Sequence, residues 1–298
     1  MNNFNNCRLC PRNCYVDRTI GKLGYCMSSS EIRAALASVH KWEEPPISGT
    51  NGSGTIFFSG CNLRCVFCQN YDISSENKGK VITVERLSQI MLEQQERGVH
   101  NINLVTAVHF VPSIIQAIEL AKDNGLKIPI IYNSSGYEKV ETIKMLEGYI
   151  DIYLPDIKYF SSELSKKYSN ASNYFEYASK AVLEMYRQTG VNNFNTNGIL
   201  EKGVIIRHMV LPSCKEDSFM ILDWIKDNIG SDAYISLLNQ YTPMYHAKQY
   251  KEINRRLMSL EYTRVVDYFF EIGLKNGYMQ EKASATSEYA PLFDLSGL

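Results

Sequence analysis

Apolar positions follow two alternating patterns along the chain. Continuous β-branched and apolar runs predict six strands, at residues 54–59, 101–105, 127–132, 150–154, 203–210 and 233–238. Stretches with an apolar residue every three to four positions predict helices at 83–98, 112–124, 138–146, 161–167, 174–189, 217–228, 248–260 and 262–276. Because strand–helix units in series form a right-handed parallel sheet, we expect an α/β fold, a partial (βα)6 barrel.

Three cysteines follow the first predicted strand with the spacing Cys-x3-Cys-x2-Cys, at Cys61, Cys65 and Cys68. Thiolates are the soft ligands of iron–sulfur clusters, and three of them occupy three corners of a 4Fe–4S cube while leaving one iron open. Gly60 permits the tight or left-handed backbone that such a loop requires. The alternative, a zinc knuckle or redox pair, would place a fourth ligand nearby, and no His or Cys follows within thirty residues.

A second group of four cysteines lies near the N-terminus, at Cys7, Cys10, Cys14 and Cys26. Four cysteines at these spacings can close a site for zinc or for a second iron–sulfur cluster, and the alternative is four structural cysteines without metal. Pro11 and nearby glycines indicate a turn-rich segment that a metal would hold together. We therefore expect a cysteine-rich metal-binding segment at 1–48 and a core with C-terminal helices at 49–298, joined by a linker at 48–53.

Composition narrows the class of protein. Of 298 residues, 45% are apolar and 21% charged, with a net charge of −1, which suits one enzyme-sized globular domain. That charge gives no general attraction for nucleic acid or an anionic membrane. No apolar run approaches eighteen residues, so we expect neither a membrane span nor a secretory signal. The clustered cysteines indicate metal binding in a reducing cytoplasm.

Polar residues recur at the ends of the later predicted strands. Taken singly, each of them could cap a helix or form a turn. The carboxyl ends of successive parallel strands meet at one rim, so together they predict a binding site. Those at strand ends are Asn133, Ser134, Ser135, Asp156, Lys158, Asn239 and Gln240, and Arg207 and His208 lie within the fifth predicted strand.

The cysteine loop resembles the signature of radical S-adenosylmethionine enzymes, including the aromatic residue Phe67 before the last cysteine. In that superfamily the three cysteines hold a 4Fe–4S cluster whose open iron is chelated by S-adenosylmethionine. The resemblance implies that one electron cleaves the sulfonium to give methionine and a 5′-deoxyadenosyl radical, which abstracts hydrogen from a substrate. It also implies an electron donor of the flavodoxin or ferredoxin type.

Over nearly its whole length the chain resembles activating enzymes of glycyl-radical enzymes, most closely proteins related to the pyruvate formate-lyase activating enzyme. The motifs that carry this likeness are Cys-Pro-Arg-Asn-Cys, Phe-Ser-Gly-Cys-Asn-Leu-Arg-Cys-Val-Phe-Cys-Gln-Asn, Leu-Pro-Asp-Ile-Lys-Tyr, Arg-His-Met-Val-Leu-Pro and Asn-Gln-Tyr-Thr-Pro-Met-Tyr. The likeness implies that Asp156 and Lys158 face S-adenosylmethionine, with Ser134 and Ser135 beside its methionine end and Gln240 near its ribose or adenine.

Two positions depart from those families. Activating enzymes place a monovalent cation near the equivalents of Asn133, Ser134 and Asp156, and Asn133 stands where they carry an aspartate. Many radical S-adenosylmethionine enzymes also end the second strand with Gly-Gly-Glu, which binds the methionine amino group. Here Thr106 and His109 are the polar side chains available for that role, and His109 would act as a neutral acceptor.

Three functions follow as hypotheses. The first is a radical enzyme that abstracts hydrogen from a glycine of a partner protein, and the second is a radical enzyme that modifies a small molecule or peptide. The third is a non-catalytic iron–sulfur or zinc protein, against which the open fourth iron argues. We expect no nucleic-acid or membrane partner, and the sequence leaves the substrate and the oligomeric state open.

Overall fold

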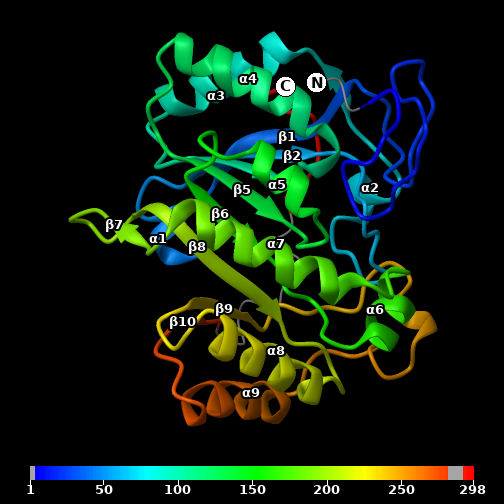
Figure 1. Ribbon diagram of the computed structural model, residues 1–298, viewed down its shortest axis with the longest axis vertical. Coiled ribbons are helices and arrows are strands. Elements are labelled where there is room, and N and C mark those ends of the chain that lie inside the picture. The colour runs from blue at the N-terminus through cyan, green and yellow to red at the C-terminus, as the bar shows by residue number, and fades with distance from the viewer. Residues whose placement is uncertain (1–3, 281–290) are drawn as a thin grey trace.

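The protein is built around one ten-stranded sheet, shown in Figure 1, in a computed structural model that describes residues 4–280 and 291–298. Seven neighbouring strands run parallel in the order β2 (Ser53–Phe58), β4 (Ile102–Val105), β5 (Ile130–Ser134), β6 (Ile152–Pro155), β8 (Leu200–Met209), β9 (Tyr234–Leu238) and β10 (Asn276–Met279). The first six are the predicted strands. The expected α/β fold, an open and mostly parallel partial barrel, is confirmed.

Helices between the strands pack side by side against the sheet. The longer ones are α3 (Val84–Glu96), α4 (Val111–Asp123), α5 (Val140–Met145), α6 (Ser162–Ser169), α7 (Tyr174–Thr189), α8 (Lys215–Asn228) and α9 (Ser259–Glu271). Helix α3 packs on α4, α5 on α7, and α8 on α9. The Thr83 side chain caps α3 by accepting from the Arg86 amide at 3.1 Å. The buried stripe Leu87, Ile90 and Met91 then faces the core.

One predicted helix is wrong. A helix was expected at 248–260. The structure instead has a short 3-10 turn at Ala247–Gln249, and the next helix, α9, begins only at Ser259. Here tertiary contacts override the helical pattern: the Tyr250 ring packs edge-on against Tyr168, and the Tyr241 hydroxyl donates to the Ile253 carbonyl at 2.7 Å. The following helix also ends sooner than predicted, because the chain after Glu271 becomes the edge strand β10.

Several strands were not predicted. Strand β1 (Ile32–His40), from the region assigned to the cysteine-rich segment, pairs antiparallel with β2 and with β3 (Lys80–Ile82). Its alanine-rich sequence lacks the β-branched signal of a strand. A short strand β7 (Asn193–Phe194) pairs with β8. Residues 1–3 and 281–290 of the two expected regions lie outside the described part of the chain.

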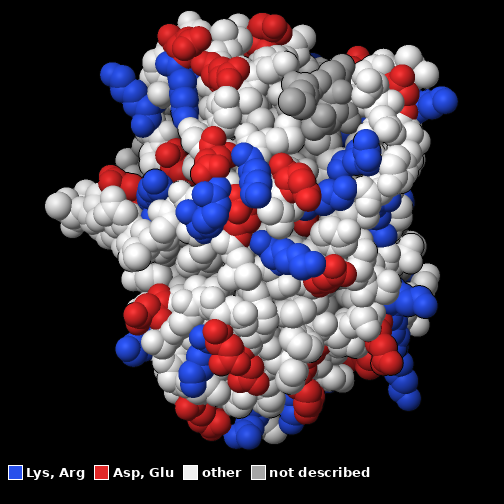
Figure 2. Space-filling model, viewed as in Figure 1, with Lys and Arg blue, Asp and Glu red and all other residues white. Residues whose placement is uncertain are grey.

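The distribution of charged side chains on the surface does not single out one binding face in the view of Figure 2. On the face in Figure 2, basic and acidic side chains are interspersed, in keeping with the net charge of −1. Within the described residues, no helix combines the length and the apolarity needed to cross a bilayer.

The register of the sheet aligns the carboxyl ends of its central strands. Val105 at the end of β4 lies opposite Asn133 of β5, and Ser134 lies opposite Pro155 of β6. An isolated parallel bridge then joins Asp156 to Arg207 of β8. Polar residues just past each strand therefore arrive at the same rim.

Candidate functional site

The cysteine loop leaves the end of β2 through a glycine that no other residue could replace without strain. Gly60 has φ +86°, and a Cβ atom there would collide with the carbonyl oxygen of Cys26. The loop therefore turns sharply at Gly60 and passes directly under the N-terminal segment. Residue Arg64 within the loop also takes a left-handed conformation, φ +53°.

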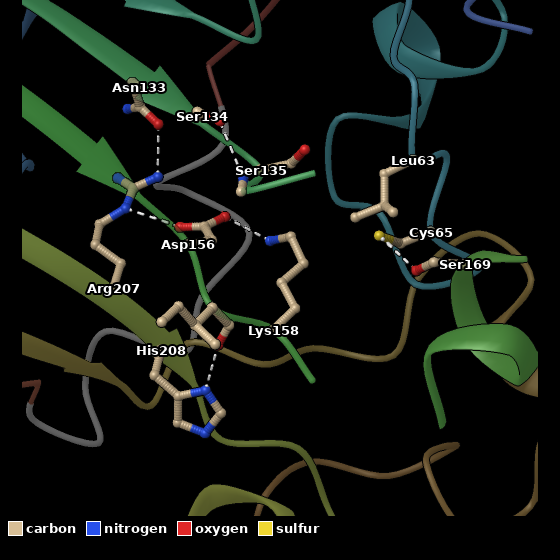
Figure 3. A network of polar contacts seen from close by, with 12 residues as sticks. Leu63, Cys65, Asn133, Ser134, Ser135, Asp156, Lys158, Ser169, Arg207 and His208 are labelled. Atoms are coloured by element: carbon tan, nitrogen blue, oxygen red, sulfur yellow. Dashed lines mark hydrogen bonds and ion pairs between the residues drawn. The ribbon is translucent and has the colours of Figure 1, made fainter. Parts of the chain in front are cut away.

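Each thiol of this loop accepts at least one hydrogen bond. The Leu63 amide donates to Cys61 Sγ at 3.3 Å, the Ser169 hydroxyl to Cys65 Sγ at 3.1 Å, and the Ser74 hydroxyl to Cys68 Sγ at 3.2 Å. Figure 3 shows the pair formed by Cys65 and Ser169. Such donors favour the charged thiolate form that binds iron.

Burial works in the opposite direction on two of these thiols. It raises the pKa of Cys61, and it raises the pKa of Cys68 to about 12, with a further contribution from the neighbouring loop thiols. Cys61 and Cys68 in this environment need the positive charge of a metal to ionise at neutral pH. The donor set therefore fits an iron–sulfur cluster.

Within the described residues, no group of three or more His, Cys, Asp and Glu side chains is arranged to hold a single metal ion. Ligands of a 4Fe–4S cube each bind a different iron, so they surround the cluster rather than meet at one point.

The three cysteines line one cavity of about 200 Å³ together with most of the predicted polar residues. These come from four different strand ends: Thr106 after β4, Ser134 and Ser135 at the end of β5, Asp156 and Lys158 after β6, and Gln240 after β9. The structure thus brings together residues that are up to 179 positions apart, from Cys61 to Gln240.

An ion-pair network forms one wall of this cavity, as Figure 3 shows. Asp156 pairs with Lys158 and accepts from Arg207 Nε at 3.0 Å, while Arg207 Nη2 donates to Asn133 Oδ1 at 2.7 Å. Burial alone would raise the pKa of Asp156, but the two cations outweigh it and lower that pKa. Asp156 therefore stays ionised at neutral pH.

His109 lies elsewhere. It is not among the residues that line the cavity; its Nε2 atom is 2.8 Å from the Ser59 carbonyl oxygen, which fixes the tautomer protonated at Nε2. Burial and the nearby Arg18 lower its pKa to about 3, so it is neutral. The Arg18 guanidinium, from the N-terminal segment, donates to the His109 carbonyl at 2.7 Å.

Two other predicted residues have internal partners. The Ser134 hydroxyl donates to Glu138 Oε1 at 2.6 Å. His208 bonds the Ile157 carbonyl through Nδ1 at 2.7 Å and the Ser218 hydroxyl through Nε2 at 2.8 Å. Burial lowers the pKa of His208 to about 4, so its role is to join β8 to its neighbours in neutral form.

The four N-terminal cysteines also lie close to one another. A Cβ atom at Gly24 would be 3.4 Å from Cys14 Sγ and 3.7 Å from Cys26 Sγ. Burial raises the pKa of Cys10 to about 12, with smaller additions from the thiols of Cys26, Cys14 and Cys7. The four thiols therefore lie in one region of the N-terminal segment, although within the described residues they are not arranged around a single metal ion.

A larger cavity of about 740 Å³ adjoins the first. Both are lined by Gln69, Asn70, Val105, Asn133, Arg207 and Gln240. The segment between β1 and the short helix α1 (Pro45–Ser48) contributes Trp42, Glu43 and Glu44 to its wall. Sequence reasoning missed these residues, and it missed Ser74 and Ser169, because none of them follows a predicted strand.

Comparison with known proteins agrees with this geometry. The family model described as the Radical SAM superfamily matches residues 55–212, which is more than half of the chain. The uncharacterized protein MJ0674 of Methanocaldococcus jannaschii is 32% identical over 275 residues, covering 89% of this chain and 75% of that protein.

Two solved structures are similar at lower identity. Streptococcus suis SuiB bound to the precursor peptide SuiA is 16% identical, with a TM-score of 0.49 over 74% of this chain and 46% of SuiB, so this chain spans less than half of SuiB. A domain of the pyruvate-formate lyase-activating enzyme from Bacteroides vulgatus ATCC 8482 is 12% identical, with a TM-score of 0.40, over 57% of this chain and 91% of that domain. On the family match, which spans more than half of its length, this chain belongs to the radical SAM superfamily.

Proposed function

We propose that this protein is an enzyme that holds a 4Fe–4S cluster at Cys61, Cys65 and Cys68 and binds S-adenosylmethionine beside it. With an electron from a donor of the flavodoxin or ferredoxin type, the bound cluster supplies the reducing power that cleaves S-adenosylmethionine to methionine and a 5′-deoxyadenosyl radical, which takes hydrogen from a substrate. One observation carries this proposal: the three thiols and the polar side chains of successive strand ends line a single cavity.

The polar residues of the cavity suit the groups of S-adenosylmethionine. Lys158 offers a compact positive charge for its carboxylate, and Asp156 offers a negative charge for its amino group. Thr106 lies on the same wall and can accept from that amino group, whereas His109 lies outside the cavity. Gln240 provides an amide for the ribose or adenine. Phe67 and Tyr241, whose ring centres lie 5.6 Å apart edge to face, give the same cavity an apolar wall.

The hydrogen donor would lie in the larger adjoining cavity, whose volume is that of a small-molecule site. This favours a small molecule or a short peptide as substrate. Activation of a glycyl-radical partner, which the sequence motifs favour, is the second candidate, and it requires a partner loop to reach the same cavity. Adding low-molecular-mass and protein fractions of a cell extract separately, and measuring which one speeds 5′-deoxyadenosine formation, distinguishes the two.

We also propose that Cys7, Cys10, Cys14 and Cys26 bind a second metal centre, either zinc or iron–sulfur. The support is the electrostatic effect of these thiols on one another and the burial of Cys7 and Cys26. The described part of their segment, residues 4–30, contributes only a small apolar cluster, with Phe4, Cys7 and Leu9 buried. A segment with so few core residues gains most of its stability from a bound metal.

The cluster proposal is tested with single cysteine variants of the anaerobically reconstituted protein. Cys65→Ala should lose both the cluster absorbance and the formation of 5′-deoxyadenosine from S-adenosylmethionine. Cys214→Ala is the matched control, because this buried cysteine lines neither cavity, and it should keep both. Retained cleavage in Cys65→Ala contradicts the proposal.

Variants of Lys158 and Asp156, the residues proposed to bind S-adenosylmethionine, test where that molecule binds. Lys158→Ala should keep the cluster and weaken S-adenosylmethionine binding about tenfold or more, since it removes one charge-assisted hydrogen bond of ~1.5–3 kcal/mol. Asp156→Ala should also weaken binding. Wild-type affinity in both variants would place S-adenosylmethionine elsewhere.

A further inference from the structure

The wall of the larger cavity carries a short acidic segment that the proposed cleavage chemistry does not use. Glu43 and Glu44 follow β1, and both line this cavity but not the smaller one. Glu43 is occupied on both oxygens: Oε1 accepts from Asn103 Nδ2 at 3.1 Å and Oε2 from Arg207 Nη1 at 3.1 Å. Glu44, by contrast, has no cation bound to its carboxyl group among the described residues.

Charges at the junction of the two cavities do not balance. Three carboxylates, from Glu43, Glu44 and Asp156, meet two cations, from Arg207 and Lys158. The ion pairs join Arg207 to Glu43 and Asp156, and Lys158 to Asp156. Glu44 has no ion-pair partner among the described residues. One carboxylate is therefore in excess at this wall.

Two other ionisable groups lie on the same cavity, and neither removes the excess. Lys41 is exposed at the rim, where solvent screens its charge, and within the described chain it forms no ion pair. Burial and the nearby Arg207 lower the pKa of His40, so its imidazole is neutral at pH 7. Burial and the neighbouring Glu43 raise the pKa of Glu44, while Arg207 and a hydrogen bond from Ser236 act against this, so a cation beside Glu44 would favour its charged form.

The Glu44 side chain is also incompletely bonded. Only 7% of the residue is exposed, and its Oε2 atom has no hydrogen-bond partner among the described residues. A buried carboxylate oxygen without a donor costs free energy, and a bound donor recovers it. The rings of Trp42 and Tyr278 line the same cavity, and aromatic faces attract cations.

We propose that the larger cavity binds its substrate through a protonated amine that pairs with Glu44. The amine supplies the missing cation and the missing hydrogen-bond donor together. This inference rests on the proposed function, because it assigns the substrate class of that same site. A volume of about 740 Å³ fits a small molecule that carries the amine, or the end of a lysine side chain entering from a peptide.

The test compares three probes of equal chain length on the full, anaerobically reconstituted protein at neutral pH. Hexylammonium, hexan-1-ol and hexanoate each have six carbons and carry a positive, a neutral and a negative head group, and binding is followed by saturation-transfer nuclear magnetic resonance. Wild type should bind hexylammonium most tightly and hexanoate least. Because this ranking needs no variant, it stands even if a substitution disturbs folding.

Glu44→Gln keeps the shape of the side chain and removes its charge. It should weaken hexylammonium binding roughly tenfold, the loss expected for one charge-assisted hydrogen bond, and leave hexan-1-ol binding unchanged. Glu141→Gln is the matched control, since Glu141 is exposed on α5 and lines neither cavity. Blocked tripeptides with a central lysine or norleucine form a second arm, and Glu44-dependent binding of the lysine peptide would identify a polypeptide as the source of the amine.

Equal binding of hexylammonium and hexan-1-ol by wild type overturns the inference, as does equal hexylammonium binding by wild type and Glu44→Gln. Formation of 5′-deoxyadenosine by wild type is measured in parallel. Cleavage without amine preference overturns this inference alone, whereas a wild type that does not cleave S-adenosylmethionine overturns the proposed function.

Discussion

Two of the three thiols in the cysteine loop receive their hydrogen bonds from outside the loop. Ser74 belongs to the short helix α2 (Tyr71–Ser74), and Ser169 ends α6. Ser169 is itself 2.8 Å from the Tyr159 hydroxyl, so a chain of three groups leads to Cys65. Hydrogen bonds to ligand sulfurs stabilise the more negative, reduced form of an iron–sulfur cluster and so raise its reduction potential.

We predict that Ser169→Ala, which removes the hydrogen bond to Cys65, lowers the reduction potential of the proposed cluster. Loss of one neutral hydrogen bond corresponds to a shift on the order of 20–60 mV for a one-electron couple. Redox titration followed by electron paramagnetic resonance measures it directly. Ser162→Ala is the control, because Ser162 is exposed at the other end of α6 and contacts no thiol. Equal potentials in the two variants would show that this bond does not tune the cluster.

The connection between β5 and α5 shows how an element fixes the rim of the site. Gly136 has φ +77°, and a Cβ atom there would collide with the Asp156 carbonyl, so this turn packs tightly on the end of β6. Glu138, with 1% exposure, accepts from the hydroxyls of Ser134 at 2.6 Å and Tyr132 at 3.3 Å. Burial raises the pKa of Glu138 to about 8 despite these bonds.

This raised pKa predicts a pH-dependent stability difference. Because the folded-state pKa lies above the unfolded value of 4.5, the contribution of Glu138 is fully present below pH 4.5 and is lost as pH rises through about 8. Wild type should lose stability relative to Glu138→Gln by about 1.4 kcal/mol per pH unit within that window. Urea unfolding of both proteins from about pH 6 to about pH 8 checks the slope. A constant difference would show that Glu138 is ionised in the folded state.

Sequence periodicity predicted the elements whose signal is local and failed where distant contacts decide. The six buried parallel strands are long apolar runs, and all six are present. By contrast, β1 is alanine-rich and exists through its pairing with β2, and residues 250–257 bend away from a helix to reach Tyr168 and Tyr241. Edge strand β10 depends likewise on its neighbour β9.

The same distinction holds for the site. Residues soon after predicted strands, such as Ser135, Asp156 and Gln240, line the cavity, because strand direction alone brings them to one rim. His109 could not be placed from sequence, since one turn of 3-10 helix rotates it toward Ser59. Glu44 was not predicted as a site residue, because it follows β1, a strand that the sequence did not predict.

The N-terminal segment, which carries Cys7, Cys10, Cys14 and Cys26, is joined to the core of the molecule at the cysteine loop. The Arg12 guanidinium donates to the carbonyls of Asn62 at 2.8 Å, Ser169 at 2.9 Å, and Asn170, and it stacks 3.8 Å from the Tyr25 ring centre. One side chain therefore joins the four-cysteine group, the cysteine loop and the end of α6. Figure 1 shows this segment beside α2.

This arrangement allows the two proposed metal centres to be separated experimentally. A variant with Cys61, Cys65 and Cys68 all changed to Ala should still bind iron or zinc, because the four N-terminal thiols have their own contacts to the core, including the Thr142 hydroxyl on the Leu9 carbonyl at 2.7 Å. Adding Cys10→Ala and Cys26→Ala should remove that metal. Metal analysis by mass spectrometry measures both steps, and circular dichroism confirms that each variant is folded. If the first variant is folded but free of metal, the N-terminal cysteines are structural, and contacts such as those of Arg12 and Thr142 hold their segment to the core without a metal.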